Sequence, residues 1–164
     1  MKHIKLDRID MRILNNLQEN GRMTNVELAK KAGISAPPCL RRVKALEEAG
    51  FIKRYHAELA ADKLGYGVTI FTEVNLNSHN ESDLAEFARL LQTWPMVRES
   101  YLTTGDADVL LKVVAESWES YQKFLTTQIM AAPRVTKIRS TLVVKNIKNA
   151  PGIPLSEGHG KSGK

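Results

Sequence analysis

Apolar residues in the first third of the chain recur with the period of an amphipathic helix. From Leu6 to Gly21 they share one helical face, with Asp7 as the N-cap and Asp10 at the third helical position. The residues on this face are Ile9, Ile13, Leu14 and Leu17. The stretch from Met23 to Gly50 predicts two more helices joined by a short turn. Because three helices can enclose a small core, residues 1–60 are predicted to form one domain.

The two helices after Met23 carry the usual boundary signals. Thr24 and Glu27 have the spacing of a capping box, in which each side chain bonds the other residue's backbone N–H group. Gly33 suits the left-handed residue that often ends a helix, and Ser35 is placed to cap the next one. These signals predict two short helices within about residues 24–49.

The second of these helices has two kinds of face. An apolar stripe with helical spacing consists of Cys39, Leu40, Val43 and Leu46. Arg41, Arg42 and Lys44 project from the other faces. A helix, a glycine turn and a basic helix are typical of a DNA-binding helix-turn-helix. A plain helical hairpin with a solvated basic face fits this stretch equally well.

The segment from Phe51 to Leu59 follows at once and is rich in aromatic and basic residues. It is interpreted as extended, and after a helix-turn-helix such a segment is a candidate wing along the DNA backbone. Lys53 and Arg54 are candidates for phosphate contacts, which do not depend on the base sequence.

The periodicity changes in the second half, after a compact linker predicted at residues 61–67. Val68 to Leu76 alternates apolar and polar residues, as a half-buried strand does. The later predicted elements are a helix through Leu84 and Leu91, strands at 97–104 and 108–115, a helix after Ser117, and a last strand through Ile138 and Val144.

The resulting order βαββαβ over residues 68–145 predicts a ferredoxin-like domain, with both helices on one face of an antiparallel sheet. The whole chain is therefore expected to be an α+β protein. The open sheet face carries apolar residues such as Phe71, and a second copy of the chain is the simplest cover for it. A homodimer is expected. Residues 146–164, rich in Gly, Pro, Ser and Lys, are predicted to be a loose tail.

The net charge of +6 is unevenly distributed along the chain. Residues 1–60 carry 12 Lys/Arg against 7 Asp/Glu, whereas residues 61–144 carry 8 against 10. The tail from residue 145 is again basic, with 4 against 1. A basic N-terminal end on a nearly neutral body favours a polyanionic partner. For the two helices after Met23, this favours a helix-turn-helix that binds double-stranded DNA over a plain helical hairpin.

Other residue counts narrow the class of protein. Cys39 is the single cysteine, so an intramolecular disulfide is excluded, and its place on the apolar stripe favours a core role. No run approaches the ~18 apolar residues of a membrane span, and the N-terminus lacks the apolar centre of a signal peptide. A cytoplasmic protein is expected. The four histidines are scattered and lack metal-ligand spacing, so no metal site and no cofactor are predicted.

The order of elements and four stretches of sequence resemble the Lrp/AsnC (feast/famine) family of transcriptional regulators. The resemblance covers roughly residues 5–145, and the stretches are LDRIDMRILNNLQENGR, NVELAKKAGIS, PPCLRRVKALEEAGFIKRY and TTGDADVLLKVV. It implies a winged helix-turn-helix DNA-binding regulator, built from dimers that often assemble into octamers. It also implies an amino-acid effector, bound by the C-terminal domain at contacts between dimers.

In that family the turn between the second and third strands carries glycine and acidic residues that help to hold the effector. The matching positions are Gly105, Asp106 and Asp108. A glycine turn lets backbone N–H groups approach a carboxylate, and an aspartate can pair with an ammonium group. An ordinary Asp-rich hairpin turn is the alternative. Ala107 stands where the family usually has an aromatic residue, which implies an enlarged or reshaped pocket.

The leading hypothesis is a sequence-specific transcription regulator gated by a small metabolite. The helix from about Ser35 to Ala49 would enter the major groove, with Ser35, Arg41, Arg42 and Lys44 facing DNA. One alternative is an architectural protein that coats DNA with little sequence preference. An enzyme with Asp106 and Asp108 as paired acids is disfavoured, since no His, Cys or Ser stands in a recognisable nucleophilic setting.

Overall fold

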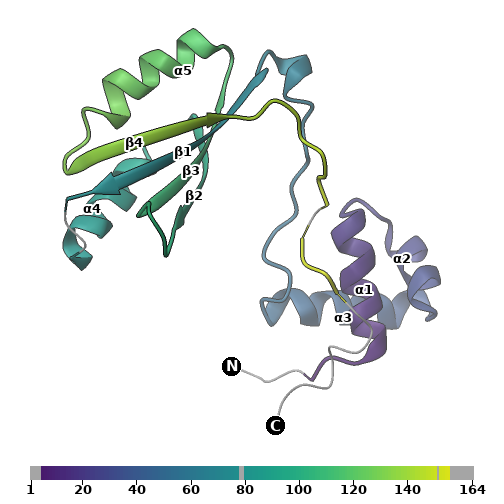
Figure 1. Cartoon of the computed structure of the whole chain (residues 1–164). Helices are drawn as coiled ribbons and strands as arrows, with labels where there is room; N and C mark the ends of the chain where they lie inside the picture. The colour runs from purple at the N-terminus through teal and green to yellow at the C-terminus, as the bar shows by residue number, and fades with distance from the viewer. Residues whose placement is uncertain (1–4, 78–79, 151, 156–164) are drawn as a thin grey trace. The chain divides into compact units, whose positions relative to one another are not determined.

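The computed structural model describes residues 5–77, 80–150 and 152–155. The chain divides into two compact units, Met1–Glu58 together with Lys148–Lys164, and Leu59–Ile147. The first contains helices α1 to α3 and the second contains a sheet with two long helices (Figure 1). The change in periodicity near residue 60 therefore coincides with the division between the units.

The first unit is built from α1 (Arg8–Glu19), α2 (Asn25–Ala32) and α3 (Ala36–Glu48). Their apolar faces meet in one core, whose buried members are Ile13, Leu28, Ala29, Ala32, Cys39 and Leu46. All three helices begin where the boundary signals predict. Capping boxes form between Asp7 and Asp10 and between Thr24 and Glu27, and Gly33 ends α2 with a φ of 78°.

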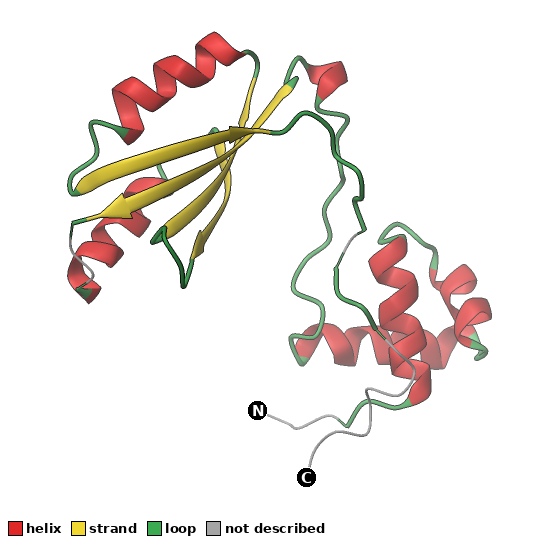
Figure 2. Cartoon of the chain, viewed as in Figure 1, coloured by secondary structure: helices red, strands yellow, loops and turns green. Residues whose placement is uncertain are grey.

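Two details of this unit differ from the sequence interpretation. Leu40 is 46% exposed and does not belong to the buried stripe of α3. The segment Phe51–Leu59 is a loop that contains no strand (Figure 2), so the expected wing is not a paired β-element. The loop is held instead by Tyr55, whose hydroxyl donates to Glu47 Oε1 at 2.9 Å. Burial first, and then the Glu47 carboxylate, raise the pKa of Tyr55 to about 12.

The tail predicted to be loose contacts α1 through Ile153. The Gln18 amide donates to the Ile153 carbonyl at 2.8 Å and accepts from the Ile153 backbone N–H at 2.9 Å. This paired contact explains why the C-terminal segment is grouped with the helical unit. Its neighbour Gly152 has a φ of 72°, a left-handed backbone conformation that favours glycine.

The second unit has the predicted order βαββαβ. Its strands are β1 (Val68–Leu76), β2 (Val97–Leu102), β3 (Val109–Ala115) and β4 (Val135–Leu142). Its helical elements are the short η1 (Asp62–Leu64), α4 (Glu81–Leu91), α5 (Trp118–Phe124) and the π-helical turn η2 (Leu125–Ile129). The sheet order is β2-β3-β1-β4, and all neighbouring strands are antiparallel.

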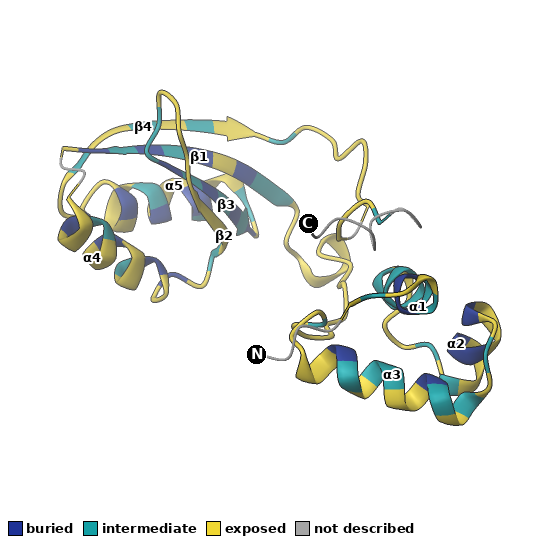
Figure 3. Ribbon diagram, turned by 90° about the horizontal axis from the view of Figure 1, so that it is seen from below, coloured by how far each residue is buried: buried dark blue, intermediate teal, exposed yellow. Residues whose placement is uncertain are grey.

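Helices α4 and α5 cover the same face of this sheet (Figure 3). The alternation in β1 is confirmed, because Ile70, Val74 and Leu76 are buried under the helices. Thr72 is also buried there, and its hydroxyl is 2.9 Å from that of Tyr121 on α5. One hydrophobic core thus forms between the two helices and one face of the sheet, and the other face of the sheet remains open.

The open face mixes apolar and charged side chains. Phe71 is 37% exposed and Tyr101 is 49% exposed, in agreement with the expectation of apolar residues there. The same face carries two cross-strand ion pairs, Lys112 with Glu99 at 2.7 Å and Arg139 with Glu73 at 3.5 Å. Surface pairs of this kind contribute little to stability. The face therefore has both the apolar area and the charges that an interface can use.

Candidate DNA and effector sites

The exposed face of α3 is the first candidate site. Pro37, Leu40, Arg41 and Lys44 are exposed on it, at the spacing of one helical stripe. Neither Arg41 nor Lys44 has an ion-pair partner within residues 5–77, 80–150 and 152–155. Ser35 is exposed at the N-cap, and its hydroxyl makes no capping bond there. The exposed side of α3 thus offers two cations, and its N-cap a hydroxyl, to a ligand.

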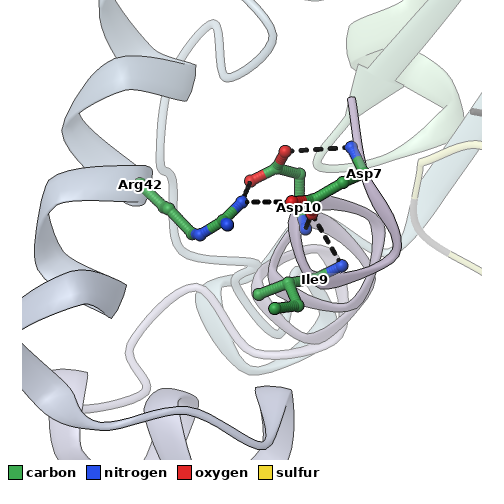
Figure 4. A network of polar contacts seen from close by, with 4 residues as sticks. All are labelled: Asp7, Ile9, Asp10 and Arg42. Carbon is green, nitrogen blue, oxygen red and sulfur yellow. Dashed lines mark hydrogen bonds and ion pairs between the residues drawn. The ribbon is translucent and has the colours of Figure 1, made fainter. Parts of the chain in front are cut away.

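Arg42 points elsewhere, into an ion-pair network with α1 (Figure 4). Its Nη1 atom lies 2.8 Å from Asp7 Oδ2 and 2.7 Å from Asp10 Oδ1. Asp10 is buried, with 6% of its surface exposed, whereas 34% of the Arg42 side-chain surface is exposed. The structure therefore separates Arg42 from Arg41 and Lys44, beside which the sequence analysis placed it.

The network extends into the capping box of α1. The Asp7 carboxylate accepts from the backbone N–H groups of Ile9 and Asp10, at 2.8 and 2.9 Å. Burial raises the pKa of Asp7, but the Asp10 N–H group and Arg42 outweigh that effect and lower it. The Asp10 carboxylate, and after it Asp7, raise the pKa of Arg42. One guanidinium thus ties α3 to the first turn of α1.

Replacing Arg42 with Ala is expected to destabilise the helical unit. The buried Asp10 carboxylate would lose its charged partner, which typically costs ~1.5–3 kcal/mol; the partial exposure of Arg42 reduces this to about 1–2 kcal/mol. Urea unfolding followed by circular dichroism measures the change. Arg41→Ala is the matched control, because it removes the same group from an exposed position. Equal unfolding midpoints for the two variants would contradict the role of the network.

A second contact fixes the helix-turn-helix itself. The Asn25 side-chain amide, at the start of α2, donates to the Ala36 carbonyl at the start of α3, at 2.8 Å. The Ile34 N–H group donates to the Ala29 carbonyl at 3.0 Å, which completes the turn after Gly33. The first turns of α2 and α3 are thereby held together, as a helix pair that docks on DNA requires.

Further cations surround this helix pair. Lys53 and Arg54 are exposed in the loop after α3. Lys30 and Lys31 are exposed in the last turn of α2, and sequence reasoning did not single them out. The sequence did contain a signal for these two lysines, because both lie off the apolar face of a helix in the most basic part of the chain.

The turn between β2 and β3 forms the second candidate site. Gly105, Asp106 and Ala107 line a cavity of about 260 Å³ on the open side of the sheet. The turn is closed by the Thr103 N–H group, which donates to the Asp108 carbonyl at 2.9 Å. The Asn75 side-chain amide donates to the Asp106 carbonyl. The Asp106 carboxylate is left exposed beside the cavity.

Asp108 does not share this position. Its Oδ2 atom accepts from the Leu76 N–H group at 2.8 Å, at the bulge that ends β1. It is half-buried and does not line the cavity that Asp106 lines. Gly105 and Asp106 therefore lie together at the cavity, whereas the Asp108 carboxylate is hydrogen-bonded to the backbone of Leu76.

Two charged residues that the sequence analysis missed also line this cavity. Arg139 on β4 and Glu73 on β1 lie opposite each other in register and line the same cavity as Asp106. Arg139 is largely exposed, with 70% of its side-chain area accessible. The alternation of β1 and β4 was the only sequence signal for them. The strand pairing that brings them beside the turn is not local in sequence.

A larger cavity, of about 420 Å³, lies elsewhere in this unit, between α4 and the turn before β4. Its wall includes Asp83 and Arg134, which form an ion pair at 2.9 Å. None of the predicted site residues lines it. Within the described part of the chain, no group of His, Cys, Asp and Glu is arranged to hold a metal ion. No helix in that part is long and apolar enough to cross a membrane.

Comparison with known proteins assigns both units. The family model described as Lrp/AsnC ligand binding domain matches residues 69–153, and that of a winged helix-turn-helix DNA-binding domain matches residues 6–53. The chain belongs to the Lrp/AsnC family of transcriptional regulators. The leucine-responsive regulatory protein of Rhizobium meliloti (strain 1021) is 46% identical to it, over 90% of this chain and 94% of that protein.

Solved structures of Lrp/AsnC regulators have the same fold. A transcriptional regulator of Neisseria meningitidis, solved as a complex with L-Met, superposes with a TM-score of 0.88 at 34% identity, covering 94% of this chain and 98% of that one. An AsnC-family regulator of Agrobacterium tumefaciens gives a TM-score of 0.86 at 35% identity, with coverages of 92% and 97%.

The two candidate sites fall within the residue ranges of the two family matches. The helix-turn-helix match contains α1 to α3 and ends at Lys53, so it includes the exposed face of α3. The ligand-binding match begins within β1 and contains the turn of Gly105 and Asp106 together with Arg139. Each candidate site therefore lies in the part of this Lrp/AsnC chain whose matched family carries the corresponding function.

Proposed function

We propose that this chain regulates transcription by binding specific DNA sites through α3 and that an amino acid bound beside Asp106 controls the binding. The observation that carries the DNA half is the exposed face of α3, where Arg41 and Lys44 stand without ion-pair partners among the described residues. Such a face can enter the major groove, because the rest of the helix is packed against α1 and α2.

The DNA contacts divide by chemistry. Arg41 suits the edge of a guanine, which offers two acceptors to a guanidinium, and Lys44 suits a phosphate. Ser35 can donate its hydroxyl hydrogen to a phosphate from the N-cap position of α3. Lys53 and Arg54 are assigned to the DNA backbone. Arg42 is assigned a positioning role, since its guanidinium is occupied by Asp7 and Asp10.

The effector half rests on the opposite charges around the 260 Å³ cavity. The exposed Asp106 carboxylate can bind an α-ammonium group, and Arg139 can bind an α-carboxylate once it leaves Glu73. Gly105 lets the backbone approach the ligand, and Ala107 leaves room for its side chain. Asp108 is proposed to support the turn through Leu76. The L-Met complex of the Neisseria regulator supports an amino acid as the class of effector.

Self-association follows from the open sheet face. Phe71 and Tyr101 offer apolar contacts there, and a second copy of the chain would cover them. We propose a homodimer as the basic unit, with further assembly toward an octamer as the family implies. A two-fold dimer would read two half-sites on one side of the duplex, spaced by about 10 base pairs or a multiple.

The paired-acid enzyme is the less favoured alternative. Asp106 is exposed beside the cavity, whereas the Asp108 carboxylate is bound to the Leu76 N–H group, so the two acids do not converge on one position. The relatives in the comparison are named as regulators. These observations favour binding over catalysis.

Selection from a random duplex library tests the DNA half and separates a regulator from an architectural protein. The full-length protein is expected to enrich a small set of related sequences, each protected over a confined footprint when competitor DNA is added. Specific sites typically bind roughly 10³–10⁷ times tighter than random DNA. A footprint that spreads evenly along every duplex would favour the architectural alternative instead.

A further inference from the structure

Leu40 is an exposed apolar residue in the middle of a basic helix face. It is 46% exposed and shares the outer stripe of α3 with Pro37, Arg41 and Lys44. It is also the fifth residue of α3, within the N-terminal half of the helix. A single exposed leucine needs no explanation by itself. Its position on this helix, however, decides what the side chain meets when DNA binds.

The orientation of α3 is fixed by the Arg42 network. Successive helical residues are rotated by ~100°, so Leu40 and Arg42 project from α3 in roughly opposite directions. Arg42 is held against Asp7 and Asp10 of α1 (Figure 4). Leu40 is thereby turned away from α1, toward the side on which a duplex would lie.

The chemistry of the major groove limits what a leucine can read. Base edges there present hydrogen-bond donors and acceptors, and the one apolar group among them is the C5-methyl of thymine. The N-terminal residues of a recognition helix are the ones that reach base edges. A leucine can neither donate nor accept a hydrogen bond, so burying a thymine methyl is the favourable contact open to it.

Building on the proposed function, we infer that Leu40 is a specificity-determining residue that packs against a thymine methyl in each half-site. The DNA sites of this regulator therefore contain a thymine at one position where its methyl group, rather than its hydrogen-bonding edge, is read. Arg41, the next residue on the same face, reads a neighbouring polar edge. The side chain of Leu40 excludes water from the contact between Arg41 and the base edge.

A double-mutant cycle with uracil tests the inference. Full-length wild-type protein and Leu40→Ala are titrated against a duplex enriched from the random library, with each thymine replaced in turn by uracil, which lacks only the methyl. At one position per half-site, uracil is expected to weaken wild-type binding about fourfold, the equivalent of one buried methyl group. The same replacement is expected to leave the affinity of Leu40→Ala unchanged. The cycle cancels any effect of uracil on DNA shape, because that effect persists in the variant.

Leu64→Ala is the matched control. Leu64 is a leucine of η1 in the second unit that is 58% exposed, so its replacement removes the same apolar group from outside the helix-turn-helix. The control is expected to keep the full uracil effect, and circular dichroism checks that both variants are folded. Equal uracil effects in wild-type and Leu40→Ala protein at every position would overturn the inference and leave the proposed function intact. A library that yields no enriched sequence would overturn the proposed function, and this inference with it.

Discussion

Arg41→Ala is expected to weaken binding to an enriched duplex by about tenfold to a hundredfold per half-site and to relax the preference for one guanine. Arg41 is exposed on α3 and has no ion-pair partner among the described residues, so its side chain does not hold the helices of the folded protein together. The free energy of unfolding should therefore stay within about 0.5 kcal/mol of the wild-type value. Gel-shift titrations against the duplex and its single-base variants measure both the affinity and the preference.

Two variants separate the role of Arg41 from a general effect of charge. Lys123→Ala removes one exposed cation from α5, and it is expected to leave the DNA affinity nearly unchanged. Lys44→Ala should weaken all duplexes alike and lower the salt dependence of binding, with a change of about 0.9 in the log–log slope for each phosphate that the protein no longer neutralises. Retention of the wild-type guanine preference by Arg41→Ala would show that another residue reads that base.

Asp106→Asn is expected to abolish the response of DNA binding to the effector while leaving binding without effector unchanged. Loss of a charged hydrogen-bond partner for the ligand ammonium costs ~1.5–3 kcal/mol, or about tenfold to a hundredfold in ligand affinity. The Asp106 carboxylate is exposed, so its replacement should leave the melting temperature nearly unchanged. The measurement is a DNA titration with and without the amino acid.

The amino acid is found first by a thermal-shift screen of the twenty amino acids against the wild-type protein. A ligand at a hundred times its dissociation constant should stabilise the folded state by ~2.7 kcal/mol. Asp62→Asn, the same change at an exposed position of η1, is the matched control and should respond like the wild type. If Asp106→Asn responds at the wild-type ligand concentration, the ammonium site must lie elsewhere in the C-terminal unit.

The elements of this protein were predictable because their causes are local. The Thr24–Glu27 capping box joins residues three positions apart, and Gly33 ends α2 through its own backbone conformation. The alternation of β1 reflects a two-residue period that does not depend on which strands become its neighbours. Each of these signals can be evaluated within a few residues.

The details of both sites depended on contacts between distant parts of the chain. Arg42 meets Asp7 and Asp10 across 35 and 32 positions, and Asp108 meets Leu76 across 32. Arg139 reaches the cavity of Asp106 because β4 pairs with β1 in one register. The spacing of residues along one helix or strand cannot predict these contacts. They depend on how the helices pack against each other and how the strands pair.

Leu40 shows the same limit at the scale of one helix. The sequence by itself determined that α3 has an apolar side and a basic side. It did not determine where the boundary falls, because Leu40 lies ~100° from the apolar Cys39 on one side and ~100° from the basic Arg41 on the other. The tertiary structure decided this point: the Arg42 network and the core around Cys39 set the rotation of α3, and Leu40 is left on its outer face.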